Sequence, residues 1–418
     1  MEKLDFHLLR QVFPERPRVA IEQALSSQLA CLASKLDCGA EIGVACGSRG
    51  ISRIAEITRV TVDVLKAHGF KPFLFPAMGS HGGATEVGQA SVLKHYGIEE
   101  QTMGAPVRAS MDVVPTGETK AGMPVFCSKV AYESDGILLI NRIKPHTDFR
   151  GEIGSGLMKM SIIGLGKRDG AAAFHRASAH GRYAGMIEAG AAVNLKAAPV
   201  LGGIAIVEDE SHEVGHLEFV EKEAIPSREK ELYLKASEWL PRLPFDEVDL
   251  LIVDEIGKDI SGTGMDTNIT GRTVHGYHAN LYNRDEAKPF VKRIFVRGLS
   301  QETQGNAIGI GAADFTLKSL VDAIDISSTY MNTLTSNTPQ NAKIPMYFDS
   351  DKEVLQVALN SLSLPNDTVA RIVWIKNTLE LQKVMVSKAC LEAIREGAVT
   401  ESLGTFEARL QRPLEWPL

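Results

Sequence analysis

A segment in the first half of the chain holds the side-chain types that acid–base and covalent chemistry use. Running from Lys144 to His175, it places His146 directly after Pro145, then a glycine-rich stretch, and then Lys159. Because proline fixes its own φ and biases the preceding residue towards an extended form, the imidazole of His146 should have a fixed direction. Such an imidazole can act as a general base near neutral pH, and a partly buried lysine can act as a nucleophile. The segment therefore predicts a catalytic or cofactor-binding site.

Two other loops carry residues that suit the same site. Small residues surround His81 in "GSHGGAT", which leaves its ring open to a ligand, and Arg49 in "GSRG" can clamp a carboxylate through two hydrogen bonds. Simpler roles are open for the histidines and the lysine. His81 could hydrogen-bond its own loop, His146 could cap a strand end, and Lys159 could lie on the surface with only its stem covered.

Two glycine-rich loops complete the set of candidates. Backbone amides between Arg150 and Gly156 can cradle a phosphate, although the glycine spacing fits neither a P-loop nor a dinucleotide-binding motif, and a plain flexible loop is the simpler explanation. In the second half, a polar loop holds Asp266, Asn268 and Arg272. These three side chains would face an interdomain cleft, unless the loop is only a surface connection.

His175 lies on a predicted helix, and His180 follows it five residues later. Residues five apart do not share one helix face, so a HExxH-type metal site is excluded. A lone imidazole such as that of His175 can bind a metal only together with donors from elsewhere.

The elements that must position these residues alternate between strand-like and helix-like segments, which indicates parallel sheets with helices on both faces. Strands are predicted at residues 41–46, 70–77, 136–142, 200–210, 248–257, 293–299, 306–314 and 369–377. Helices are predicted from about 52 to 69 and at 86–96, 227–240 (capped by Ser227), 350–362 and 380–397. Three candidate loops follow strands of the first half, and ligands of such sheets sit at the carboxyl ends of the strands. We therefore expect an α/β protein with two domains, 1–243 and 244–418, each a mainly parallel sheet flanked by helices, with the active site in the cleft between them.

Composition narrows the classes of partner. The chain has 418 residues, 44% of them apolar and 23% charged, and a net charge of −7 without a block of lysine and arginine. Such a chain can bury a real core and is a poor candidate for binding nucleic acid or an anionic membrane. Its five cysteines form no CxxC pair, its first residues lack an apolar signal-peptide core, and no apolar run approaches a bilayer span. We expect reduced thiols, a cytoplasmic location and no membrane contact.

Taken together, the candidate loops resemble those of the nickel-dependent lactate racemase family, which uses a nickel-pincer nucleotide. In that family a strand-end arginine precedes a loop of the form G-[ST]-H, and a Pro-His segment with a glycine-rich lysine motif and a further histidine follow. The corresponding segments here are "GSRG", "GSHGGAT" and "PHTDFRGEIGSGLMK", and His175 follows Lys159 by sixteen residues, as in the family. The resemblance covers about residues 40–180 and extends to the remainder only in general layout.

The resemblance implies a role for each candidate. Lys159 would carry the pincer nucleotide (pyridinium-3-thioamide-5-thiocarboxylic acid mononucleotide) covalently through a thioamide, and His175 would be the protein ligand to nickel. His81 and His146 would form an acid/base pair, one on each face of the substrate, while Arg49 would hold the substrate carboxylate. The residues expected to lie against the nucleotide are Gly151, Gly154, Ser155 and Gly156.

The implied reaction inverts C2 of a 2-hydroxy acid. The hydrogen on that carbon is a very weak acid, so moving it as hydride to a pyridinium carbon avoids a carbanion. One histidine would take the hydroxyl proton as hydride leaves, and the other would supply a proton when hydride returns on the opposite face.

The sequence departs from the family in the loops that would contact substrate. The gap from His146 to Lys159 is longer than in the family, Cys46 replaces an acidic residue, and the Tyr-Gln…Lys signature of the second half is absent. We therefore expect a substrate larger or more polar than lactate, such as a sugar acid or a dicarboxylate, read by Asp266, Asn268 and Arg272.

Other functions fit the same residues. A hydrolase or lyase could use the histidines with a divalent ion, although no carboxylate cluster with metal spacing is visible. A non-catalytic sugar-acid-binding protein could retain the cleft without turnover. The expected partners are a small 2-hydroxy acid and the enzymes that make the cofactor, and a homodimer is an option that the sequence leaves open.

Overall fold

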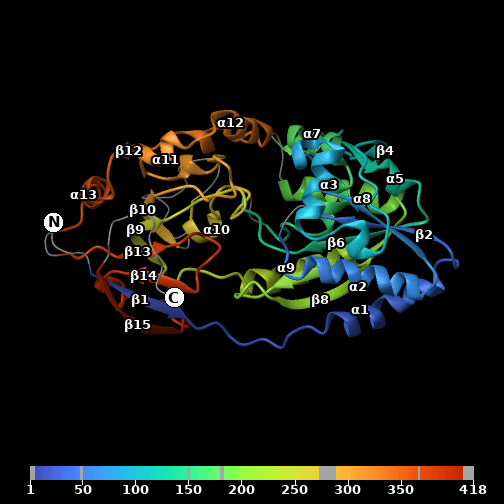
Figure 1. The fold of residues 1–418 in the computed structure, drawn as a ribbon, viewed down its shortest axis with the longest axis horizontal. Helices are drawn as coiled ribbons and strands as arrows, with labels where there is room; N and C mark the ends of the chain where they lie inside the picture. Colours follow the sequence, from blue (N-terminus) through green and yellow to red (C-terminus); the bar gives the residue numbers. More distant parts are fainter. Residues whose placement is uncertain are drawn as a thin grey trace. The chain divides into compact units, whose positions relative to one another are not determined.

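The computed structural model describes residues 5–47, 50–147, 151–178, 183–272, 289–365 and 368–407 (Figure 1). Within these ranges the chain forms two compact α/β units. The contiguous unit consists of residues 15–240, and the split unit combines the residues up to Pro14 with those from Pro241 onward. None of the helices in these ranges combines the length and apolar character needed to cross a bilayer.

The contiguous unit is built on a mainly parallel sheet. Its strands, in spatial order, are β3 (Lys71–Pro76), β2 (Glu41–Cys46), β6 (Gly136–Arg142), β7 (Val200–Glu208) and β8 (Val214–Glu221). The first four run parallel, and β8 pairs antiparallel with β7. A separate antiparallel hairpin joins β4 (Val113–Glu118) to β5 (Pro124–Ser128).

Helices cover both faces of this sheet because its strands are apolar on both sides. The helical segments are α1 (Ile21–Leu29), η1 (Ala30–Ser34), α2 (Ile54–Ala67), η2 (Gly82–Ala84), α3 (Glu86–His95), α4 (Glu100–Met103), α5 (Lys129–Tyr132), α6 (Leu157–Lys159), η3 (Met160–Gly164), α7 (Lys167–Ser178), α8 (Tyr183–Ala197) and α9 (Ile225–Glu238). Val44 and Leu138 pack with α1 to α4 on one face. Ala45 and Leu139 pack with α6 to α9 and the hairpin on the other.

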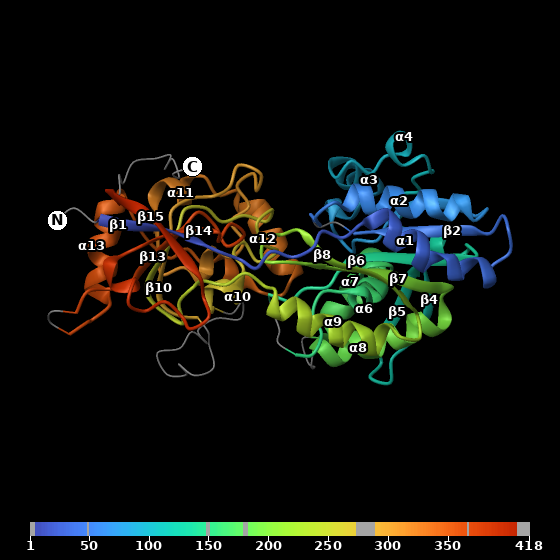
Figure 2. The same cartoon turned by 90° about the horizontal axis from the view of Figure 1, so that it is seen from below.

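The split unit contains a mixed sheet of eight strands in the described part of the chain. In spatial order they are β12 (Met346–Phe348), β11 (Phe315–Leu317), β10 (Phe290–Val296), β9 (Glu247–Val253), β13 (Ile372–Ile375), β14 (Lys383–Val386), β1 (Asp5–Gln11) and β15 (Thr400–Glu407). The strands from β12 to β13 are parallel, whereas β14, β1 and β15 continue the sheet antiparallel. Figure 2 shows β1, in blue, beside the red strands from the other end of the chain.

The helical segments of the split unit are mostly short. They are α10 (Thr267–Thr270), η4 (Ile310–Ala312), α11 (Lys318–Asp322), α12 (Ile326–Thr335), η5 (Pro339–Ala342), α13 (Asp351–Ser361) and η6 (Lys388–Cys390). Leu250 and Trp374 pack beneath α13 on one face of the sheet, and Leu251 and Val373 belong to a second core on the other.

The expected fold class is confirmed: both units are α/β layers with large, mainly parallel sheets and flanking helices. The strand predicted at 41–46 and the helix predicted at 86–96 are present. Thr85 caps this helix, and its Oγ1 accepts a hydrogen bond from the Gly88 amide at 3.1 Å.

Two predicted elements and one predicted helix cap are wrong. Residues 306–314 form a turn and η4 instead of a strand, because Gly309 has a φ of 94° and lies against the backbone of Thr263. Residues 380–397 hold strand β14 and η6 instead of a helix, since β14 pairs with β13 and β1. Helix α9 begins at Ile225, so Ser227 lies inside it and does not cap it.

The division into units also differs from the expected one. The expected first domain ran from residue 1 to 243, but β1 pairs with β14 and β15 and so belongs to the split unit. The change of unit later in the chain falls between Leu240 and Pro241, close to the expected position.

Candidate active site

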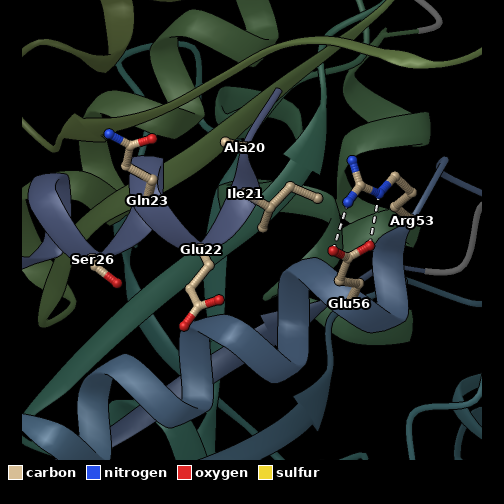
Figure 3. A pocket seen from close by; sticks show the side chains of 7 residues that line it. All are labelled: Ala20, Ile21, Glu22, Gln23, Ser26, Arg53 and Glu56. Atoms are coloured by element: carbon tan, nitrogen blue, oxygen red, sulfur yellow. Dashed lines mark hydrogen bonds and ion pairs between the residues drawn. The ribbon is translucent and has the colours of Figure 1, made fainter. Parts of the chain in front are cut away.

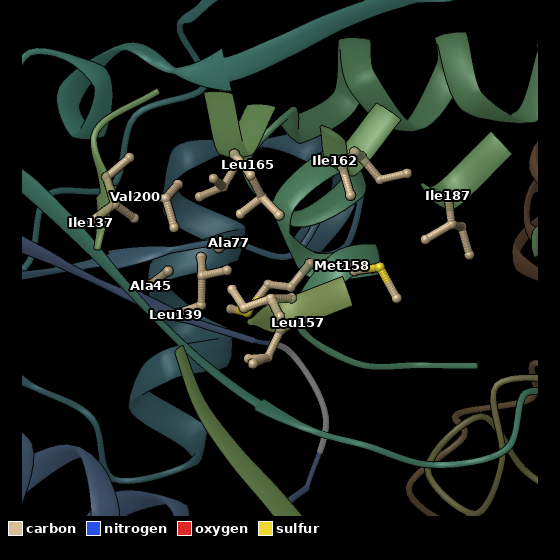
Figure 4. Close-up of a cluster of buried hydrophobic side chains, with 14 of the residues drawn as sticks. Ala45, Ala77, Ile137, Leu139, Leu157, Met158, Ile162, Leu165, Ile187 and Val200 are labelled. Carbon is tan, nitrogen blue, oxygen red and sulfur yellow. The ribbon is translucent and has the colours of Figure 1, made fainter. Parts of the chain in front are cut away.

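Lys159 stands on a rigid base within the contiguous unit. It ends α6, and the chain continues directly into the wide π-helical turn η3, a geometry that is frequent at functional sites. Leu157, Met158 and Met160 around it are buried and pack with Ile162 in the core (Figure 4). Lys159 itself is only partly covered, so a fixed backbone presents a long side chain that is still accessible.

The amine of Lys159 contacts the imidazole of His146. The distance from Lys159 Nζ to His146 Nε2 is 2.5 Å, so one of these nitrogens donates a hydrogen bond to the other. When the ammonium donates, the imidazole is neutral and carries its hydrogen on Nδ1. The loop of His146 is closed by two hydrogen bonds of 2.9 Å between the backbones of Lys144 and Ser155. The two groups that the sequence analysis singled out are therefore in direct contact.

His175 lies close enough to Lys159 to interact with it electrostatically. It lies on α7, and its pKa is lowered first by burial and then by the positive charge of Lys159. A lowered pKa leaves the imidazole neutral at physiological pH, which is the form that can bind a metal ion.

An aromatic contact chain links the two histidines, and sequence reasoning missed its central member, Tyr183. The ring centroid of Tyr183 lies 5.5 Å from that of His146 and 4.7 Å from that of Phe174, whose own centroid is 5.9 Å from that of His175. Tyr183 begins α8. Its only sequence signal was an aromatic residue at the start of an apolar helix.

The loop that carries His81 packs against the segment between Lys159 and His175. A Cβ atom added to Gly79 would lie 3.1 Å from Cγ2 of Ile163 and 3.6 Å from Cβ of Ala171. His81 is thus only two residues from a close contact with this segment.

The glycine-rich loop splits into accessible and buried members. Gly151 is exposed and Ser155 is partly covered. Gly154 and Gly156 are buried because their Cα atoms press against other parts of the chain: Gly154 against the backbone of Lys144, and Gly156 against the carboxylate of Glu229. Close packing thus requires glycine at these two positions. The sequence analysis predicted only a nucleotide contact for them.

Glu229 on α9 is a second residue that sequence reasoning missed. Its side chain is 1% exposed, and Oε2 accepts a hydrogen bond from the backbone amide of Met158 at 2.8 Å. Burial is the dominant effect on its carboxyl group and raises the pKa to about 7. Its spacing could have revealed it, since Ile225, Glu229 and Leu232 share one helix face.

The three polar candidates of the split unit have local partners. Asp266 is 4% exposed and caps α10, accepting hydrogen bonds from the backbone and side-chain nitrogens of Asn268 at 2.9 Å. Arg272 donates to a carboxylate oxygen of Asp314 at 2.8 Å and to carbonyls of β10. These contacts stabilise the loop and β10, a role that the sequence analysis did not foresee.

Several candidates lie outside the described residues, namely Arg49, Arg150 and His180.

Elsewhere in the contiguous unit, a surface hollow lies between the beginnings of α1 and α2 (Figure 3). Its charged residues include Arg53 and Glu56, which neutralise each other through hydrogen bonds of 2.6 and 2.7 Å. The hollow contains none of the predicted site residues.

Protein side chains alone do not form a metal cage in the part of the chain that the structure describes. There, no group of three or more histidine, cysteine, aspartate or glutamate side chains is arranged to hold a metal ion. A metal at His175 would need most of its donors from a bound ligand.

Comparison with solved structures places the fold in a known class. No protein-family model matches the chain, and no curated protein does. A protein of known structure from Thermotoga maritima is 14% identical and superposes with a TM-score of 0.51, covering 85% of this chain and 95% of its own. The lactate racemase apoprotein from Thermoanaerobacterium thermosaccharolyticum is 15% identical with a TM-score of 0.50, covering 88% of this chain and 94% of its own. The chain therefore has a fold like that of the lactate racemase apoprotein.

Proposed function

We propose that this protein is a racemase or epimerase that inverts C2 of a 2-hydroxy acid larger or more polar than lactate, with a nickel-pincer nucleotide attached to Lys159. The observation that carries the proposal is the cluster of an amine and two imidazoles. Lys159 Nζ is 2.5 Å from His146 Nε2, and its charge lowers the pKa of His175. The fold likeness to lactate racemase apoprotein supports the same class of reaction.

The residues present fit the proposed cofactor. Lys159 offers an accessible primary amine on a fixed backbone, and His175 offers a neutral imidazole near it. A pincer ligand brings several donors of its own to the metal, which suits a site without a protein cage among the described residues. When bound, the group would supply a carbon that accepts hydride and returns it.

The side chains of the chain would manage the protons. His146 would take the hydroxyl proton of one enantiomer, and His81 would act on the other face. Attachment of Lys159 as a thioamide removes the ammonium charge, so His146 would no longer share a proton with it. Arg49 would bind the substrate carboxylate.

The test is to coexpress the chain with the enzymes that make the nickel-pincer nucleotide. Peptide mass spectrometry should find an adduct on Lys159, and elemental analysis should find about one nickel per chain. A panel of 2-hydroxy acids in deuterated water should then show inversion with retention of the original hydrogen on C2. Unmodified Lys159 and nickel-free protein under these conditions would refute the proposal.

A further inference from the structure

A buried lysine lies beside the proposed site without belonging to it. Lys167 is 0% exposed, and its ammonium donates hydrogen bonds to the carbonyl oxygen of Pro76 and, at 3.4 Å, to Oε1 of Gln89. Its Nζ also lies 5.8 Å from the ring centroid of Phe75. Burying an ammonium costs several kcal/mol even when hydrogen bonds compensate in part. An apolar side chain would fill this space at lower cost in free energy. The presence of a buried lysine here therefore calls for an explanation.

The hydrogen bonds of its partner, Gln89, provide that explanation. This side chain on α3 is also 0% exposed, and its Nε2 donates to the carbonyl oxygens of Gly79 at 2.8 Å and His81 at 3.3 Å. The ammonium of Lys167 can only donate and the two carbonyls can only accept, so the amide of Gln89 has one satisfied orientation. The lysine thus orients the amide, and the amide holds the loop of His81.

The loop needs such support because its backbone is glycine-rich. Gly79, Gly82 and Gly83 have φ values of 60°, 63° and 65°. Glycine adopts positive and negative φ about equally readily, so these residues do not by themselves fix the loop conformation. Lys167 itself has a φ of 53°, a strained value for a residue with a Cβ atom. That backbone conformation occurs where η3 gives way to α7, eight residues after Lys159.

We propose that Lys167 and Gln89 are positioning residues that hold the His81 loop in register with the segment carrying Lys159 and His175. The inference rests on the proposed function, in which His81 must face a group attached to Lys159. The ammonium of Lys167 joins this segment to the end of β3 through its hydrogen bond to Pro76. It also binds the amide of Gln89, which in turn donates a hydrogen bond to the carbonyl of His81.

Two variants separate this role from simple packing. Lys167→Met fills the space without the ammonium, and Gln89→Glu keeps an acceptor for Lys167 while removing the donors to Gly79 and His81. Lys196→Met, at an exposed lysine on α8, is the matched control. If Lys167→Met fails to fold, Gln89→Glu still tests the proposal, because its buried carboxylate faces a buried cation.

The first measurement uses the chain without cofactor. Hydrogen exchange of peptides covering residues 78–84 should accelerate about tenfold or more in both variants and stay unchanged in the control. The ring signals of His81 in NMR spectra should shift and broaden in both variants. Unchanged exchange and unchanged ring signals in Gln89→Glu would overturn the proposal.

The second measurement uses protein loaded with cofactor. We expect normal modification of Lys159 and a fall in kcat of about 10- to 100-fold with little change in KM, since the misplaced group acts in the chemical step. Normal turnover in both variants would overturn the positioning role while leaving the proposed function intact. Faster exchange of the loop in a chain that never acquires the adduct would refute the proposed function and leave the structural tie in place.

Discussion

The contiguous and split units place different kinds of charge next to their parallel sheets. In the split unit, Arg297 after β10 is 2% exposed and donates to Asp351 at 2.6 Å and to Asp254 at 2.5 Å. In the contiguous unit, the loop after β6 brings together the bases Lys159 and His146. Removing one partner of a buried ion pair leaves an uncompensated charge and destabilises the fold, whereas a cluster of bases is characteristic of functional sites. The comparison predicts that changes in the two regions affect different properties.

Lys159→Met should have the largest effect. The variant removes the only amine proposed to attach the cofactor, so turnover should fall to below about a thousandth of the wild-type value. Because the base of α6 is apolar, the free energy of unfolding should change by less than about 1 kcal/mol. Racemisation assays and urea unfolding measure the two quantities, with Lys196→Met as the control. Appreciable turnover by Lys159→Met would contradict the contrast between the units.

Arg297→Met should show the opposite behaviour. It leaves Asp254 and Asp351 without their buried cation and should lower the free energy of unfolding by about 3–5 kcal/mol. Hydrogen exchange by mass spectrometry assigns the loss to peptides of the split unit. Arg10→Met, which breaks an exposed pair with Glu401 in the same unit, should cost less than about 1 kcal/mol. Equal effects of the two variants would show that the buried network is not what stabilises this unit.

Glu229→Gln should make stability less dependent on pH. The folded-state pKa of Glu229 is raised from 4.5 to about 7, so the folded protein binds this proton more tightly than the unfolded chain does. Its contribution is fully present below pH 4.5 and is lost as pH rises through 7. Relative to wild type, the variant should therefore gain up to about 3 kcal/mol between pH 5 and pH 8. Urea unfolding at both pH values measures this change, and a pH-independent difference would contradict it.

Asp266→Ala should have the smallest effect. It removes the cap of α10 and should cost about 1 kcal/mol of unfolding free energy. If Asp266 also reads the substrate, KM will rise as well, and the rise should be larger for polar substrates than for lactate. An unchanged KM with reduced stability would restrict Asp266 to its capping role.

The sequence allowed the parallel core and part of the candidate site to be predicted. Short apolar runs such as Gly136–Arg142 have few alternatives to a buried strand, and His146 and Lys159, both singled out in the segment after that strand, lie in contact. The segment 380–397 was misjudged because its helical pattern is overridden by strand pairing across the sheet. The local spacing of apolar residues carries no information about strand partners that are distant in the sequence.

Burial of individual polar residues was harder to predict. Lys159 is partly buried, as predicted, but nothing in the sequence singled out Lys167, which lies between glycine and arginine and is 0% exposed. Its pKa is lowered to about 8 by burial. Gln89 and Glu229 occupy buried helix faces with Leu93 and Leu232, so helical spacing carried a signal that their polar character concealed.

The position of β1 has a consequence for protein synthesis. Phe6, Leu8 and Leu9 are 1%, 1% and 2% exposed in the finished sheet, but their partners in β14 and β15 lie more than 370 residues further along the chain. At ribosomal rates, this apolar strand waits on the order of half a minute for its neighbours. Residues 15–240 emerge during that interval and can complete their own core. The apolar strand β1 therefore stays unpaired in the nascent chain while the contiguous unit folds.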